Sequence, residues 1–183
     1  MKKNNKIFFH GLLFLFFTFL LCTFQSVIWF QLFGNLTSPF LSFVLFVYFG
    51  LDKDSWKSLL FCYSIVYIYS LFTYTSIGML YFSSMITFLF LFIVKNRVYW
   101  PGPIYFTIMT SSSLFLFHLS YILSSLAFES RHTPLLLGSR FLQLVWTSIV
   151  AYFSYHLIKK IDISFKPEIL ADIHRDSHGD THG

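Results

Sequence analysis

The sequence predicts an all-α integral membrane protein, built as one bundle of about six transmembrane helices. Three observations predict this fold class. Of the 183 residues, 56% are hydrophobic and only 11% are charged, whereas soluble domains carry about 25% charged residues. Several runs of 16 or more residues contain no charge, which is typical of helices that cross a membrane. The charges gather in short clusters between these runs, as in DKDSWK, from Asp52 to Lys57.

The first span is expected over residues 7–33. The N-terminal sequence MKKNNKIFFHGLLFLFFTFLLC resembles a signal peptide, because basic residues precede an apolar core. The apolar run continues to about Phe33, however, and no small-x-small cleavage motif follows it. We therefore expect an uncleaved first helix. Cys22 in this span and Cys62 in the third are expected to pack as small hydrophobic side chains, not to form a disulfide or a metal site.

The second and third spans are marked by helix-capping residues. A Ser-Pro pair at 38–39 predicts a helix start, so the second span is expected over residues 39–51. These residues make only about 20 Å of helix, less than the ~30 Å hydrocarbon core. The second span is therefore expected to recruit flanking residues, to thin the bilayer locally, or to be re-entrant. Asp54 and Ser55 cap the third span, expected over residues 56–73.

The last three spans follow similar signals. A Thr-Ser pair precedes the fourth span, residues 77–94, and a WPGP motif that ends at Pro103 separates it from the fifth, residues 104–128. A Thr-Pro pair at 133–134 repeats the cap-and-proline signal and opens the sixth span, residues 134–157. Residues 1–160 are thus expected to form one six-helix transmembrane domain.

The basic residues predict the orientation, because cytoplasmic loops attract Lys and Arg. With six spans, eleven of the thirteen Lys and Arg residues fall on one side of the membrane, together with both termini. Arg131 and Arg140 fall on the other side. The DKDSWK cluster is therefore expected to be a cytoplasmic turn whose acids cap the next helix and whose lysines fix the orientation. Both termini are expected to be cytoplasmic.

Residues 161–183 are expected to form a cytoplasmic tail. A D-x-H unit recurs in it every four residues, with Asp at positions 172, 176 and 180 and His at positions 174, 178 and 182. Histidine-rich tracts can bind Zn²⁺ or Ni²⁺. The end of the tail lacks apolar residues to bury, however, so we expect a solvated, disordered segment without a specific ligand.

The chain lacks the motifs of common membrane enzymes. It contains no HExxH zinc motif and no GxSG serine-protease motif. A membrane-phosphatase pattern needs a PSGH element with closely spaced Arg, His and Asp, but Arg140, His156 and Asp162 are far apart. No carboxylate lies deep in a predicted span, which disfavours a proton-coupled pump. We expect no catalytic residue, cofactor or metal site in the spans, and no nucleic-acid partner.

Two ionisable residues within the spans are the candidate site residues. His118 lies near the middle of the fifth span, where an ionisable group is a functional candidate by default. The alternative is that His118 has only a structural role, as a neutral imidazole hydrogen-bonded to a Ser or Tyr of a neighbouring helix. Arg140 lies less than two turns into the sixth span. Its side chain is expected either to reach back to the outer interface or to contact a partner or an extracytoplasmic carboxylate.

Three stretches carry a resemblance to a known family. They read SPFLSFVLFVYFGLDKDSWKSLLF, YTSIGMLYFSSMITFLFLFIVKNRVY and SRFLQLVWTSIVAYFSYHLIKKID. The first is a Pro-led apolar helix that ends in VY-x-GL before a charged turn, and the second is a turn with a Gly before a helix closed by basic residues. The third is an Arg-led last helix that ends in a basic pair and Asp. In these features the chain resembles the rod shape-determining protein MreD family, in a short and divergent form.

The resemblance implies a non-catalytic scaffold of the bacterial cell-wall elongation machinery, located as a multi-pass protein in the cytoplasmic (inner) membrane. MreD-like proteins act with the actin-like MreB and the bitopic MreC to maintain rod shape and support peptidoglycan synthesis. The resemblance therefore implies MreC-like and MreB-like partners within and beside the lipid bilayer.

Two other functional classes stay open on the residues alone. The substrate-binding component of an energy-coupling-factor vitamin transporter also has six spans at this size. It needs polar residues that converge on an extracytoplasmic pocket. A membrane enzyme would need His118 or Arg140 as a catalytic group.

Overall fold

The computed structural model describes residues 2–34, 36–52, 55–73, 75–97, 102–128 and 136–165. This part of the chain is all-helical and contains no strand, as the sequence predicts. Its helices are α1 (Lys2–Thr23), η1 (Phe24–Ile28), α2 (Trp29–Phe33), α3 (Leu41–Asp52), α4 (Ser55–Ser70), α5 (Ile77–Lys95), α6 (Pro103–Phe128) and α7 (Leu137–Phe165). α1, η1 and α2 follow one another without a break, so they form one long helix with a π-helical turn inside it. The predictions for residues 166–183, and for Lys53 and Asp54 of the charged turn, lie outside the described residues.

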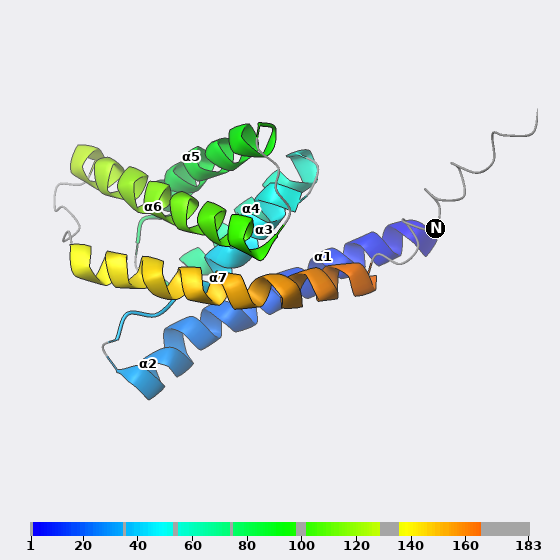
Figure 1. Ribbon diagram of the computed structural model, residues 1–183, viewed down its shortest axis with the longest axis horizontal. Coiled ribbons are helices and arrows are strands. Elements are labelled where there is room, and N and C mark those ends of the chain that lie inside the picture. Colours follow the sequence, from blue (N-terminus) through cyan, green and yellow to red (C-terminus); the bar gives the residue numbers. More distant parts are fainter. Residues whose placement is uncertain are drawn as a thin grey trace, which may run out of the picture.

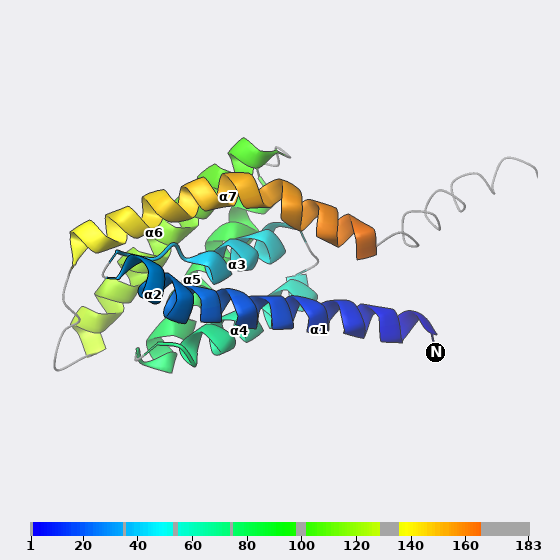
Figure 2. The same cartoon turned by 90° about the horizontal axis from the view of Figure 1, so that it is seen from below.

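The helices form a bundle in which successive helices reverse direction (Figure 1). The N-terminal end of α1 and the C-terminal end of α7 lie at the same end of the bundle, and both views agree on this (Figures 1 and 2). The C-terminal ends of α2, α4 and α6 lie toward the opposite end. This up-and-down order is the one that six membrane crossings require.

Four of the described helices are long and apolar enough to cross a membrane: Leu12–Phe33, Ile77–Lys95, Pro103–Phe128 and Leu137–Ile161. Two shorter apolar helices, Leu41–Leu51 and Ser58–Ser70, accompany them. The 12 residues of α3 and the 16 residues of α4 span about 18 Å and about 24 Å, less than the ~30 Å hydrocarbon core. Four membrane-length helices are therefore established, and six crossings remain a prediction.

Several helix ends differ from the predicted ranges. α3 begins at Leu41, so the Ser-Pro pair at 38–39 does not cap it and lies in a non-helical segment before it. α4 ends at Ser70, because residues 71–73 continue as tight turns with i to i−3 hydrogen bonds. α7 continues to Phe165, so the first residues of the predicted tail are helical. Ile158 and Ile161 still pack against the core there, which explains the extension.

α3 is the central helix of the bundle. Every residue from Ser42 to Leu51 is buried, and α3 contacts α1, α4, α5, α6 and α7. It carries no charge before Asp52, so its buried part places no ionised side chain in the core. Aromatic rings surround it, with ring centroids 4.9 Å apart for Phe14–Phe49, 5.1 Å for Phe49–Phe61 and 5.5 Å for Phe43–Phe117. The other helices are thus arranged around an aromatic core that α3 provides.

α3 approaches α5 closely at Gly50. A Cβ atom added to Gly50 would lie 2.8 Å from Cδ1 of Leu91, a fully buried residue of α5. Cβ atoms essentially never lie this close to another atom, so a side chain at Gly50 would force the Cδ1 methyl group of Leu91 to shift within the core.

Three side chains from other helices satisfy the non-helical backbone before α3, where Pro39 and Phe40 are buried. The Phe40 N–H donates to Oγ1 of Thr147 (2.8 Å), the Leu41 N–H donates to Oε1 of Gln25 (3.2 Å), and Nε2 of Gln143 donates to the Ser38 carbonyl (3.2 Å). Irregular backbone at membrane depth is tolerated only where protein or water satisfies its polar groups. We call Gln25, Gln143 and Thr147 the α3 clamp. Gln25 is the buried residue of the π-helical turn η1.

Two small side chains of α4 satisfy backbone carbonyls near the other end of α3. Oγ of Ser58 donates to the Phe49 carbonyl (2.6 Å), and Sγ of Cys62 donates weakly to the Phe46 carbonyl (3.5 Å). Cys22 and Cys62 are both buried free cysteines, in agreement with the packing role that the sequence predicts. Neighbouring helices therefore hydrogen-bond to both halves of this short helix.

Candidate functional site

One face of α7 carries polar side chains at successive turns, and each of them hydrogen-bonds to another element. The pairs are Arg140 with His118, Gln143 with Ser38, Thr147 with Phe40, and Ser148 with Ser111. The opposite face is apolar and exposed, as at Phe141, Val145 and Ile149. Polar groups on the bundle side and apolar groups outside are the arrangement expected of a membrane helix.

Arg140 and His118, the two candidate site residues of the sequence, contact each other. Nη1 of Arg140 lies 3.3 Å from Nδ1 of His118. A guanidinium can only donate hydrogen bonds, so Nδ1 is the acceptor and the imidazole is the neutral tautomer with its proton on Nε2. Nε2 is buried and has no hydrogen-bond partner among the described residues. The imidazole therefore orients one side of the guanidinium without neutralising its charge.

Two tyrosines complete the surroundings of Arg140. Its Cζ atom lies 5.6 Å from the ring centroid of the buried Tyr121, within the range of a cation–π interaction. Tyr69 of α4 lies within electrostatic reach of the guanidinium. Neither tyrosine was singled out from the sequence, because their roles depend on which helices adjoin α7. We call Arg140, His118 and Tyr121 the arginine cluster.

The structure changes one sequence-based expectation about the cluster. His118 contacts the guanidinium of the half-buried Arg140 instead of a Ser or Tyr. The position of Arg140 at the outer interface, or its contact with a partner, stays a prediction. The sequence did hold a signal for this pairing. His118 and Arg140 lie at equal distances from position 129, between α6 and α7. Residues placed in this way meet when two helices pack as an antiparallel hairpin.

An open groove lies next to the arginine cluster, between α5, α6 and α7. It has a volume of about 460 Å³ and is lined by Phe90, Ser111, Ser112, Phe115, Leu116 and Leu144. Leu144 lies one turn after Arg140 on α7, and Phe115 lies one turn before His118 on α6. The groove therefore begins beside the cluster and runs from it toward the middle of both helices.

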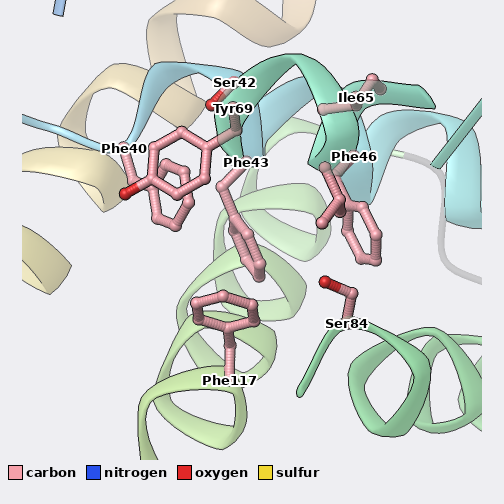
Figure 3. A pocket seen from close by; sticks show the side chains of 9 residues that line it. Phe40, Ser42, Phe43, Phe46, Ile65, Tyr69, Ser84 and Phe117 are labelled. Atoms are coloured by element: carbon pink, nitrogen blue, oxygen red, sulfur yellow. The ribbon is translucent and has the colours of Figure 1, made fainter. Parts of the chain in front are cut away.

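The centre of the bundle holds a much smaller space (Figure 3). This cavity has a volume of about 10 Å³, and Phe40, Phe43 and Phe117 are among the side chains that line it. That volume holds about one water molecule. The Oγ atom of Ser42 on its wall is buried and has no hydrogen-bond partner among the described residues. The cavity is therefore too small for a vitamin or another small-molecule substrate.

Within the described ranges, no group of three or more His, Cys, Asp or Glu side chains could hold a metal ion. The D-x-H units of the tail lie outside these ranges. A comparison with family models, with curated proteins and with solved structures gave no match.

Proposed function

We propose that this protein is a non-catalytic membrane scaffold of the bacterial cell-wall elongation machinery, with a role like that of MreD. It would reside in the cytoplasmic membrane with both termini in the cytoplasm, bind MreC-like and MreB-like partners, and thereby support rod shape and peptidoglycan synthesis. The observation that carries the proposal is the filled centre of the bundle, together with the three MreD-like stretches of the sequence.

The filled centre favours a scaffold over a substrate-binding component. Small-molecule sites are clefts or cavities of about 300–1,000 Å³, whereas the central cavity here measures about 10 Å³. The larger space, the groove beside α6, is open to the surroundings of the bundle and mostly apolar in its lining. A vitamin carrier needs an enclosed pocket with convergent polar groups, whereas the centre of the bundle is filled by aromatic side chains that include Phe40, Phe43 and Phe117.

The exposed face of α7 supports a role in binding partners. Only 17% of the membrane-length part of α7 is buried, compared with 44% for α6. Its outer face presents large apolar side chains at three- and four-residue intervals, namely Leu137, Phe141, Val145, Ile149, Tyr152, Phe153 and Leu157. α7 also contains the whole of the third MreD-like stretch, residues 139–162. A transmembrane helix of a bitopic partner can pack along such a face through van der Waals contacts.

Co-purification with a matched pair of variants tests the proposal. The tagged protein is extracted from its own cells, and the proteins that elute with it are identified. We expect MreC-like and MreB-like proteins with the wild type and with Phe82→Ala, and reduced amounts with Phe153→Ala. Both phenylalanines are exposed, at 51% and 72%, but only Phe153 lies on α7. Recovery of a pair of ATPases with a coupling protein would replace the scaffold proposal with the transporter alternative.

A further inference from the structure

The guanidinium of Arg140 has unused capacity to bind an anion. A guanidinium has five N–H donors. Among the described residues, the one hydrogen bond of the Arg140 guanidinium is the long contact to Nδ1 of His118. The described groups that act on it electrostatically are Tyr121 and Tyr69, and neither is a carboxylate. A cation that is half-buried in a membrane helix is costly unless it pairs with another polar or charged group or reaches water, and an anion is one such partner.

The cluster fixes the guanidinium in a position that suits a phosphate. The Cζ atom of Arg140 lies 5.6 Å from the centroid of the Tyr121 ring, and Nη1 contacts His118. Among the described residues, no further hydrogen bond occupies the remaining N–H groups of the guanidinium. An arginine stacked on an aromatic ring keeps its planar donor fork, which matches two oxygens of a phosphate. This binding mode requires the fork as well as the charge.

The apolar groove beside the cluster indicates that the phosphate belongs to a lipid. Arg140 lies in the first turn of α7, near the end of the bundle, whereas the groove lies one turn or more further along the helices. Phe115, Leu116 and Leu144 form apolar walls for it. The charged Arg140 near the end of the bundle matches the headgroup of a phospholipid, and the apolar groove that leads inward from it matches an acyl chain.

We propose that the arginine cluster and the groove together bind one anionic phospholipid, with its phosphate on Arg140 and an acyl chain between α5 and α7. Basic pockets between transmembrane helices bind anionic lipid headgroups on the cytoplasmic side of membranes, and the same pairing of a guanidinium with a phosphate is available to a phospholipid of the outer leaflet. The site goes beyond the scaffold proposal and does not depend on it, because it needs only a membrane that contains an anionic phospholipid.

The test measures the thermal stability of the purified full-length protein in a neutral detergent while lipid is added. Dioleoylphosphatidylglycerol should raise the melting temperature in a saturable way, and dioleoylphosphatidylcholine should act much more weakly. Arg140→Gln should weaken the apparent affinity for phosphatidylglycerol by about fivefold or more. Arg140→Lys keeps the positive charge but loses the planar pair of N–H donors, so its apparent affinity for phosphatidylglycerol should fall between those of the wild type and Arg140→Gln. It serves as the second variant if Arg140→Gln does not fold.

The groove is tested separately from the charge. Ser112 lines the groove and is exposed, so Ser112→Phe should obstruct the acyl chain and reduce binding while Arg140 is untouched. Ser26→Phe places the same ring at another exposed serine, far from the groove in the sequence, and should bind like the wild type. Arg97→Gln removes an exposed arginine outside the cluster and should also bind normally.

Four results would overturn the proposal. The first is an unchanged response of Arg140→Gln to phosphatidylglycerol. The second is an equal melting shift from inorganic phosphate alone, which would make the cluster a site for a free anion. The third is a phosphatidylglycerol-induced melting shift that is absent from the wild type and appears only in Glu129→Gln, where the carboxylate that follows α6 in the sequence is removed. The guanidinium would then be neutralised by Glu129 within the chain, not by a lipid. Loss of an MreC-like partner from Arg140→Gln, without any lipid effect in the wild type, would also replace the lipid with a partner carboxylate.

Discussion

Substitution of Thr147 by Val tests whether the α3 clamp stabilises the central helix. Oγ1 of Thr147 donates to the Gln143 carbonyl of its own helix (2.6 Å) and accepts the Phe40 N–H (2.8 Å). Valine has nearly the same shape but no acceptor, so the buried Phe40 N–H would lose its partner. An unsatisfied buried backbone donor costs about 1–3 kcal/mol. We therefore expect the free energy of unfolding to fall by about this amount.

Thr110 offers a closely matched control. Both threonines are 0% exposed, and both donate to the carbonyl four residues earlier, at 2.8 Å for Thr110. Thr110 accepts no backbone N–H from another helix in the described structure. Thr110→Val should therefore leave the free energy of unfolding nearly unchanged. The substitution removes the hydroxyl group together with its hydrogen bond, so no buried donor is left without a partner.

The assay is reversible unfolding in mixed detergent micelles, followed by circular dichroism, with the free energy extrapolated to zero denaturing detergent. Thr147→Val should be less stable than Thr110→Val by about 1–3 kcal/mol. Thr147→Ser, which keeps the acceptor, should recover most of the difference. Equal stability of the two valine variants would refute the reasoning, since the contact to the Phe40 N–H would then contribute nothing.

Further predictions address packing, the tail and the topology. Gly50→Ala should lower the free energy of unfolding by about 1–3 kcal/mol through overlap with Leu91. Gly138→Ala, with nothing within 4 Å of the added Cβ, should leave the free energy of unfolding unchanged or slightly higher. Equal effects of the two substitutions would contradict the close α3–α5 contact. Deleting residues 172–183 should leave membrane insertion and helicity unchanged, as checked by fractionation and circular dichroism, and loss of insertion would give the tail a structural role. Calorimetry with Zn²⁺ on the tail peptide should detect no micromolar binding. Reporter fusions in the loop after α3 should report a cytoplasmic location, and fusions in the loop after α4 an external location. An external location of the loop after α3 would contradict the prediction that α3 crosses the membrane.

Helix positions could be predicted from the sequence because each helix is a long apolar run bounded by polar or charged residues. The start of α3 could not. The Ser-Pro pair at 38–39 has the local signature of a helix start, yet the helix begins at Leu41. The N–H groups of Phe40 and Leu41 are instead taken by side chains that lie 107 and 16 residues away in the sequence. Such distant partners override a local capping preference, and no local pattern encodes them.

The arginine cluster could be predicted only in part. Arg140 and His118 stand out in the sequence because ionisable residues are rare within apolar spans. Their contact follows from the antiparallel α6–α7 hairpin, whose register also brings Ser111 and Ser148 together at 2.7 Å. Tyr121 could have been found from the same register, since it lies one turn after His118. Tyr69 could not, because it comes from α4, and its position depends on how α4 packs against the hairpin.

The central claim, a scaffold for cell-wall elongation, is tested most directly by depleting the protein from its own cells. Cell shape and the uptake of labelled vitamins are measured in the same culture as the protein disappears. We predict that the cells lose their rod shape and become round, while vitamin uptake stays normal. Cells that keep their rod shape and lose the uptake of a vitamin would contradict the scaffold function.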